Sequence, residues 1–142
     1  MWYIQTNNNS ISVFEPTEEE LNQYYGFVYE IIELSTGKRY IGKKFFWNKK
    51  ILPITKTRKR RKRALVESDW RDYYGSSTEV QSLVEQNGKD NYNRIILRLC
   101  KTKGECSYYE AKYQFENDVL LRDDYYNEFI GCKIHSKHVK GK

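Results

Sequence analysis

The chain of 142 residues is long enough to form one domain with its own hydrophobic core. Its composition of 39% hydrophobic and 31% charged residues is ordinary for a soluble globular protein, and its net charge of +6 favours a polyanionic partner only weakly. No segment approaches the ~20 apolar residues of a membrane-spanning helix, and the amino-terminal residues lack the pattern of a signal peptide. We therefore expect a soluble, cytoplasmic protein with no membrane partner.

The cysteines do not indicate a metal site. Cys100 and Cys106 are separated by five residues, a spacing that matches no common zinc motif, and Cys132 makes the total odd. We expect three reduced thiols.

Residues 1–24 are interpreted as an amino-terminal appendage that packs on the core. They contain two short strand candidates, residues 1–5 and 11–14, separated by an Asn triplet. Thr17 and Glu20 have the spacing of a capping box, which predicts a short helix that ends near Gln23.

A β-hairpin is expected at residues 25–45. Apolar and aromatic side chains occupy both faces of its first strand, which is typical of a strand inside a sheet. Ser35, Thr36, Gly37 and Lys38 have the composition of a turn, in which Gly37 can take a positive φ. By composition, residues 48–53 are predicted to be a loop.

A dense basic run follows, with seven cations in residues 56–63. Such a run repels itself unless an anion neutralises it. It can be a solvated loop, but we favour binding of a phosphate backbone, which carries no sequence specificity by itself. The residues assigned to DNA here are Arg58, Lys59, Arg60, Arg61, Lys62 and Arg63, within a basic insert at residues 48–68.

The second half of the chain alternates helix and strand signals. A helix over residues 79–86 would begin after Ser76 or Ser77 and end at Gly88. Residues 92–100 are predicted to be the third strand of the sheet, and residues 105–121 a helix with an apolar stripe of Tyr108, Ala111, Phe115 and Val119. Residues 135–142 form a basic tail, whose His135 and His138 are assigned no role.

Two tyrosines in the hairpin carry a resemblance to a known family. Tyr40-Ile41-Gly42 matches one half of the signature of GIY-YIG nucleases, and Phe27-Val28-Tyr29 resembles the other half, with the glycine replaced. The segments Asp69–Ser77 and Cys106–Ala111 add similarity to free-standing phage endonucleases of the Seg and homing type. The resemblance covers about residues 25–134, taken as the nuclease domain. It implies an α/β (α+β) fold with a small three-stranded, mostly antiparallel sheet flanked by helices.

The resemblance also implies a site. Tyr29 would help deprotonate or orient the attacking water, with a pKa lowered by nearby cations and metal, and Tyr40 would bind near the scissile phosphate. Glu110 would be the single carboxylate that holds Mg²⁺, for which Mn²⁺ can substitute. Asn127 corresponds to a late asparagine that orders the site.

The catalytic cation departs from the family pattern. The position ten residues after the second tyrosine, where the family commonly has an arginine, is Lys50. Lys44 is the first choice to replace that arginine, because it extends the signature strand; Lys43, Arg58, Arg61 and Arg71 remain alternatives. Lys43, Trp70 and Arg71 are also predicted to contact DNA.

Together these features predict an Mg²⁺-dependent DNA endonuclease, phage-encoded and of the homing or DNA-processing type, acting in the host cytoplasm. The alternative is a non-catalytic DNA-binding or regulatory protein that keeps the fold. Cutting of both strands by one metal site would require a homodimer on DNA or two successive nicks.

Overall fold

The computed structural model describes residues 1–52, 54–56, 62–131 and 133–140. Its centre is a five-stranded mixed sheet with the strand order β2 (Ile11–Val13), β1 (Trp2–Gln5), β7 (Tyr92–Cys100), β3 (Gly26–Glu33) and β4 (Arg39–Phe45). Strand β1 runs parallel to β7, and the other neighbours are antiparallel.

The expected three-stranded sheet is therefore too small. The three predicted strands are β3, β4 and β7, and the amino-terminal segment adds β1 and β2. Residues Trp2–Ile4 pair with Arg94–Ile96, and the Trp2 indole is only 3% exposed. Burial of this large ring holds the added strand pair on the sheet.

The central hairpin has the predicted form. Strand β3 lies between β7 and β4 and is buried on both faces, as its apolar pattern indicated. The connecting turn has Gly37 at φ +77°, a conformation that glycine adopts at little cost.

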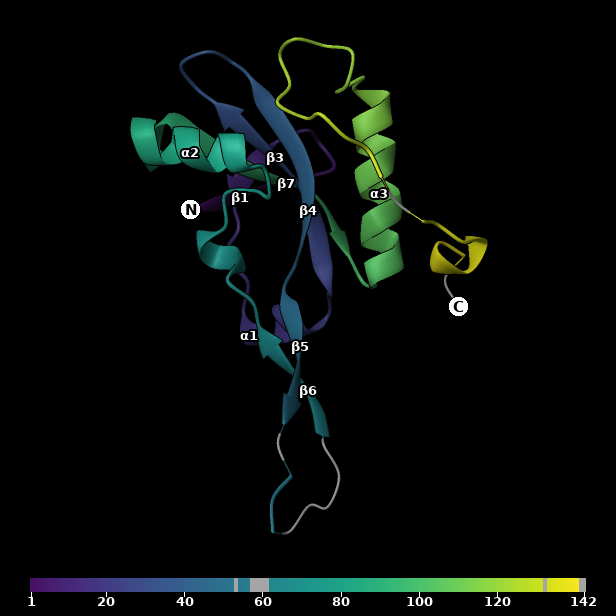
Figure 1. Cartoon of the computed structure of the whole chain (residues 1–142). Coiled ribbons are helices and arrows are strands. Elements are labelled where there is room, and N and C mark those ends of the chain that lie inside the picture. The colour runs from purple at the N-terminus through teal and green to yellow at the C-terminus, as the bar shows by residue number, and fades with distance from the viewer. Residues whose placement is uncertain (53, 57–61, 132, 141–142) are drawn as a thin grey trace.

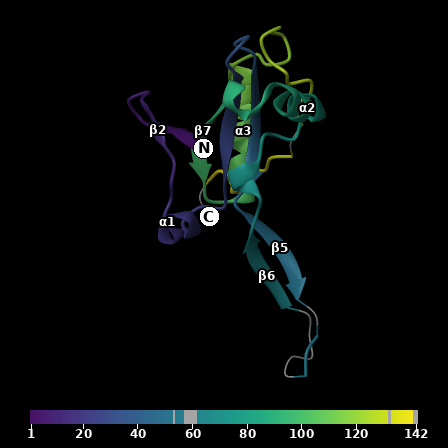
Figure 2. The ribbon, with the colours of Figure 1, turned by 90° about the vertical axis from the view of Figure 1, so that its left-hand side faces the viewer.

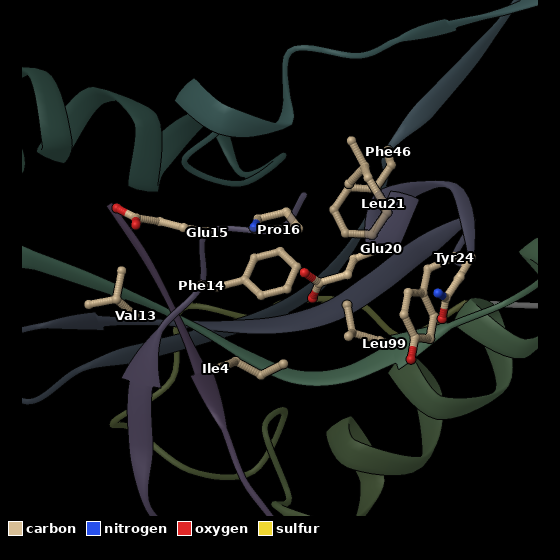
Figure 3. A pocket seen from close by; sticks show the side chains of 11 residues that line it. Ile4, Val13, Phe14, Glu15, Pro16, Glu20, Leu21, Tyr24, Phe46 and Leu99 are labelled. Carbon is tan, nitrogen blue, oxygen red and sulfur yellow. The ribbon is translucent and has the colours of Figure 1, made fainter. Parts of the chain in front are cut away.

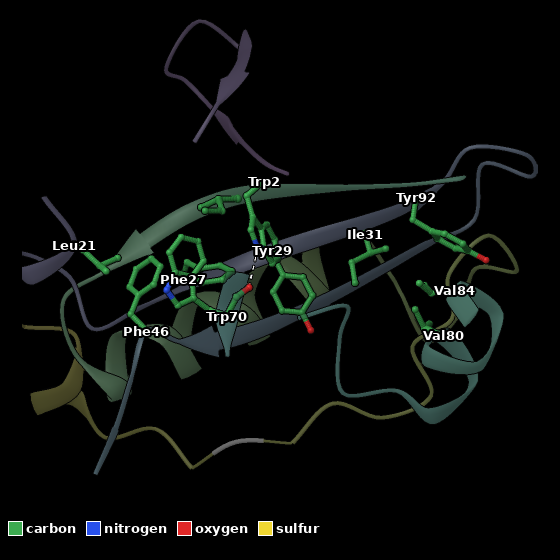
Figure 4. Packing of buried hydrophobic residues seen from close by; sticks show 11 residues of the cluster. Trp2, Leu21, Phe27, Tyr29, Ile31, Phe46, Trp70, Val80, Val84 and Tyr92 are labelled. Carbon is green, nitrogen blue, oxygen red and sulfur yellow. Dashed lines mark hydrogen bonds between the residues drawn. The ribbon is translucent and has the colours of Figure 1, made fainter. Parts of the chain in front are cut away.

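Helices cover the two faces of this sheet (Figure 1). On one face, Phe27, Tyr29 and Ile31 belong to a buried cluster that extends to Val80 and Val84 of α2 (Thr78–Asn87), as Figure 4 shows. The other face carries Val28 and Ile41, which pack with Cys106 of α3 (Lys103–Glu116) and with Val119. Both clusters follow from the alternation of side chains along β3 and β4.

Local signals located the helix starts well. In the short α1 (Glu18–Asn22), the Glu20 N–H donates to Thr17 Oγ1 and the Thr17 N–H donates to Glu20 Oε1, which is the predicted capping box. Ser77 caps α2, and Gly88 follows its last residue.

The end of α3 differs from the prediction. The helix ends at Glu116 rather than at residue 121, and Asp118 has φ +50°. Asn and Asp tolerate this left-handed conformation better than other non-glycine residues, so the chain can reverse there. Phe115, expected in the apolar stripe, is 65% exposed.

Residues 48–53 were predicted to be a loop, but residues 48–52 belong to a strand. Strand β5 (Trp47–Leu52) pairs antiparallel with β6 (Lys62–Glu67) in a separate two-stranded sheet. This hairpin projects away from the body of the molecule (Figures 1 and 2). Two 3₁₀ turns, η1 (Trp70–Asp72) and η2 (Lys89–Asn91), flank α2 in the chain, and a third, η3 (Ser136–His138), lies near the carboxyl end.

Within the described ranges, every helix is too short or too polar to cross a bilayer.

Candidate active site

The two signature tyrosines lie on the same face of neighbouring strands. Tyr29 of β3 pairs with Gly42 of β4, and Tyr40 lies two residues before Gly42 on the same strand. The ring centroids of Tyr29 and Tyr40 are 6.3 Å apart. The hairpin that the sequence predicted thus brings both phenols together.

Gly42 has a steric role in this arrangement. A Cβ atom at Gly42 would lie 2.5 Å from the Tyr29 hydroxyl and 2.8 Å from its Cζ. A side chain at this position would therefore displace the Tyr29 ring. The absence of a side chain at Gly42, the glycine of the Tyr-Ile-Gly tripeptide, leaves the space that the Tyr29 phenol occupies.

Tyr29 is too deeply buried to activate a water molecule at the protein surface. Its side chain is 0% exposed, and burial raises the pKa of its phenol well above the usual value, with smaller contributions from the neighbouring tyrosines and Glu110. The expected lowering of this pKa is therefore not present in the chain alone. Contact with a phosphate requires the side chains packed over Tyr29 to move.

Tyr73 and Ser76 belong to the same cluster, and sequence reasoning missed them. The Tyr73 ring packs edge-on against Tyr29 at 5.9 Å between centroids, and the Tyr40 hydroxyl lies 2.9 Å from Ser76 Oγ. Burial raises the pKa of Tyr73 and of Tyr40. Both missed residues lie in the Asp69–Ser77 segment, which supported the resemblance without being assigned to the site.

The Tyr29 hydroxyl is a buried polar atom without a hydrogen bond of good geometry in the described part of the chain. The Tyr73 hydroxyl is nevertheless close enough to affect its titration. A Cβ atom at Gly75 would lie 3.5 Å from the Tyr29 oxygen. Two glycines therefore line the space around a phenol oxygen that has unused hydrogen-bonding capacity.

Glu110 of α3 is the carboxylate that the sequence resemblance assigned to the site. Its Oε1 lies 3.9 Å from Lys43 Nζ, and Lys43 also donates to Ser107 Oγ at 2.8 Å. Burial raises the pKa of Glu110, whereas the Lys43 ammonium lowers it. The charge of Glu110 also raises the pKa of Tyr40, so the carboxylate and the phenol are electrostatic neighbours.

These residues fit a metal ion held by few protein ligands. The described residues contain no cluster of three His, Cys, Asp or Glu side chains, so a site made of protein ligands alone is not present among them. Mg²⁺ commonly uses one or two carboxylates and keeps waters and substrate oxygens as further ligands. The half-buried Glu110 carboxylate gains from a nearby cation, because that charge offsets its lost hydration.

The candidate cations separate into two environments. Lys43 faces Glu110, whereas Lys44 donates to Asp69 Oδ1 at 2.6 Å and lies 4.1 Å from the centroid of the Tyr73 ring. Arg71 pairs with Glu67 at 3.3 Å and stacks on Trp70. Among the described candidates, Lys43 is the cation beside the carboxylate, and Lys44 is the cation on the tyrosine face.

Asn127 bonds to the backbone of β4 next to the tyrosines. Its Oδ1 accepts from the Ile41 N–H at 3.0 Å, and its Nδ2 donates to the Ile41 carbonyl at 2.8 Å. Gln114 of α3 donates to the same carbonyl at 3.0 Å. Asn127 is 8% exposed, so this contact fixes the strand between Tyr40 and Gly42.

The burial of Trp70 contradicts one predicted DNA contact. Its indole is 1% exposed and packs with Phe14, Phe27 and Phe46. The ring belongs to the core and is not available for stacking on DNA. Of the basic run, Lys62 and Arg63 lie on β6, and Arg58, Lys59, Arg60 and Arg61 lie outside the described residues.

A surface hollow of about 420 Å³ lies beside Tyr40. It is lined by the start of α2 from Ser76 to Glu79 and by the segment from Tyr126 to Phe129. Its hydroxyl groups offer polar contacts next to the phenols, but Glu79 and Glu128 also line it, so their charge opposes the binding of an anion there.

A second hollow, of about 310 Å³, lies away from these residues between the amino-terminal segment and the sheet (Figure 3). Its lining is mostly apolar, with Ile4, Phe14, Leu21 and Leu99, and the Glu20 carboxylate accepts hydrogen bonds from Thr17. It brings none of the signature residues together, so the tyrosine cluster is the better candidate for chemistry.

Comparisons with known proteins agree with this geometry. The family model described as "Putative endonuclease segE, GIY-YIG domain" matches residues 6–130. A protein of Enterobacteria phage T4 named "Putative endonuclease segE" is 30% identical over 104 residues, which are 72% of this chain and 40% of that protein. The chain thus spans less than half the length of this relative. No solved structure gave a significant match. With its signature tyrosines on paired strands and its family match over most of the sequence, the chain belongs to the GIY-YIG endonuclease family of the SegE type.

Proposed function

We propose that this chain is a DNA endonuclease that hydrolyses phosphodiester bonds with Mg²⁺, or Mn²⁺ in its place. The observation that carries the proposal is the Lys43–Glu110 pair at 3.9 Å, together with the Tyr40 phenol on the other face of β4, whose pKa burial and the Glu110 charge raise. A phenol, a carboxylate and an ammonium are the groups needed to bind a phosphate, hold a cation and offset developing negative charge.

Each residue has a distinct part in this proposal. A metal ion at Glu110 would polarise the phosphate and lower the pKa of its bound water. Tyr40 would donate its hydroxyl proton in a hydrogen bond to a phosphate oxygen, with Ser76 fixing the direction of the phenol. Lys43 would offset the charge that accumulates on the phosphate.

Tyr29 would act as a neutral phenol. Because burial raises its pKa, it keeps its proton near neutral pH and would position the site by hydrogen bonding rather than remove a proton. This role differs from the base role that the sequence suggested. Asn127 would hold the intervening strand in register through Ile41.

The test is nicking of supercoiled plasmid in Mg²⁺ and in EDTA. We expect wild type to nick in Mg²⁺ alone and Glu110→Ala to be inactive. Glu116→Ala is the matched control, because Glu116 lies on the same helix, is 56% exposed in its side chain and pairs only loosely with Lys112 at 3.9 Å. No cleavage by wild type across varied DNA substrates would favour the alternative, a DNA-binding protein without catalysis.

We further propose a phage homing or DNA-processing role, for which the phage T4 relative is the support. Sequencing the ends produced on genomic DNA separates the two. Ends at a few sites would indicate homing, and scattered ends would indicate processing or degradation. A homodimer on DNA is proposed only for cutting of both strands, and a concentration series that compares nicked with linear product tests it.

A further inference from the structure

The positive charge of the chain is concentrated in one segment of the sequence. Residues 47–67 contain nine lysines and arginines and one glutamate, a net charge of +8. The whole chain carries +6, so the remaining residues carry a net charge of −2. Any electrostatic attraction to DNA must therefore come mainly from this segment.

The ribbon, defined as strands β5 and β6, is open on both faces. Ile51 is 56% exposed, Leu65 is 54% exposed and Val66 is 39% exposed. An isolated two-stranded sheet is marginally stable in water and gains stability from packing on a partner. Large aliphatic side chains with this exposure, on the same two strands as Lys49 and Lys50, indicate a surface that is covered in use by a polyanion with apolar groups.

The register places these residues on defined faces. Lys49 is paired with Leu65, and Ile51 lies two residues further along the same strand, so the three share one face. Asn48, Lys50 and Val66 belong to the opposite face. One face therefore combines two aliphatic side chains with a lysine.

The dimensions and the chemistry of the ribbon match the major groove of DNA. That groove is about 12 Å wide and admits a two-stranded β-ribbon. Its base edges offer the methyl group of thymine to aliphatic side chains and the O6 and N7 atoms of guanine to lysine. A strand pair that carries Lys49 and Lys50 beside exposed aliphatic side chains can both attract the phosphate backbone and contact bases.

We propose that the ribbon inserts into the major groove of duplex DNA and reads base edges with the face formed by Lys49, Ile51 and Leu65. This inference rests on the proposed function in taking DNA as the ligand. It assigns target recognition to a part of the catalytic chain itself.

The position of the ribbon relative to the candidate active site predicts how far the recognised bases lie from the cut. Strand β5 follows β4 after a single residue, Phe46, and continues away from the body (Figure 1). From Lys44 to Ile51 the chain advances seven residues, which is about 23 Å at the rise of a strand. At 3.4 Å per base pair, this corresponds to about seven base pairs. Recognised bases should therefore lie on one side of the cut and within about ten base pairs of it.

The experiment is selection from a pool of duplexes with a randomised centre, bound to the wild-type chain in EDTA so that binding is read without cutting. The test variant is Ile51→Ser/Leu65→Ser. The matched control is Ile11→Ser/Leu121→Ser, which makes the same changes at positions that are 54% and 83% exposed elsewhere. Thermal melting checks that all three chains are folded.

We expect wild type and the control to enrich the same motif and the ribbon variant to show at least about ten-fold weaker preference for it. A second pair, Lys49→Gln/Lys50→Gln against Lys89→Gln/Lys101→Gln, measures the electrostatic share of the affinity that the ribbon supplies. In Lys49→Gln/Lys50→Gln, the slope of log affinity against log salt concentration should become shallower by about one for each phosphate that the variant no longer binds. The body pair should leave it unchanged.

Three results would overturn the inference: no motif enriched by wild type, the same motif enriched equally by the Ile51 and Leu65 variant, or an equal loss of preference in its matched control. These are distinct from failure of the proposed function. A chain that nicks plasmid in Mg²⁺ but enriches no motif keeps the enzymatic proposal and loses this one. A chain that enriches a motif but never nicks does the opposite.

Discussion

The glycine beneath Tyr29 gives the sharpest test of the site. In Gly42→Ala, the new Cβ would lie 2.5 Å from the Tyr29 hydroxyl, 2.8 Å from its Cζ and 3.0 Å from Tyr40 Cε1. An ordinary contact begins near 3.4 Å, so the Tyr29 ring must retreat by nearly 1 Å. It cannot do so freely, because Trp2, Phe27 and Tyr73 pack around it.

Overpacking of this kind typically costs about 1–3 kcal/mol. For a domain of this size, a loss of about 2 kcal/mol lowers the melting temperature by roughly 4–8 °C. The displaced phenols should also reduce plasmid nicking far more than the loss of stability explains, since the chain stays folded at the assay temperature.

The control is Gly88→Ala. Gly88 has φ +85° and ψ +149° with no atom within 4 Å of the added Cβ, so this change strains the backbone by about 1–3 kcal/mol without moving a tyrosine. It should lower the melting temperature and spare nicking. Adding Tyr29→Phe to Gly42→Ala removes the closest contact and should recover part of the stability, which a double-mutant cycle measures. Wild-type stability and activity in Gly42→Ala would refute this packing of Tyr29 on Gly42.

Three further predictions address the surrounding residues. Asn127→Ala removes two hydrogen bonds and leaves the Ile41 N–H without its partner, although the Ile41 carbonyl keeps Gln114, so we expect a loss of about 1–3 kcal/mol in chemical denaturation; a loss below about 0.5 kcal/mol would contradict it. Glu110→Gln should raise the melting temperature at neutral pH in EDTA. Because burial raises the folded-state pKa of Glu110, its ionisation costs stability above that pKa, and the gain should disappear as the pH falls below the unfolded-state pKa. The gain should be absent in the exposed Glu116→Gln, and an equal gain in both would argue against burial as the cause. Lys43→Ala should reduce nicking at saturating Mg²⁺ more than Lys44→Ala, because Lys43 lies 3.9 Å from Glu110 whereas Lys44 pairs with Asp69; the reverse order would restore Lys44 as the catalytic cation.

The features that sequence located correctly are those with local signals. The Thr17–Glu20 capping box, the turn at Gly37 and the cap at Ser77 each depend on residues within a few positions of one another. The hairpin that brings the two signature tyrosines together was also predicted, because its strands and turn are contiguous in sequence.

The features that sequence missed depend on distant contacts. Asn48, Lys49 and Lys50 have no strand-like alternation, and they become a strand only because residues 62–67 pair with them. Trp70 lies beside Arg71 and resembles an exposed aromatic, but Phe14, Phe27 and Phe46 from three other segments enclose it. Strand β1 pairs with a partner some ninety residues away.

The sequence also did not distinguish the catalytic cation, and the reason is a different one. Lys43 and Lys44 are adjacent in sequence, and no local pattern distinguishes them. The alternation of the strand sends them to opposite faces, so that one meets Glu110 and the other meets Asp69 and Tyr73. Our proposal of Lys43 therefore rests on the position of α3.

The contacts of Asn127 also limit how copies of the chain can associate. Strand β4 is the last strand of the sheet, and an outer strand with free N–H and C=O groups is a template for adding a strand from another molecule. Here Arg39 bonds to Asp124 and Tyr126, and Asn127 occupies both backbone groups of Ile41. Strand β2, at the opposite end, has only three residues. Two copies that act together on one duplex would therefore not join by extending the five-stranded sheet at β4, and Asn127→Ala should make the chain prone to aggregation.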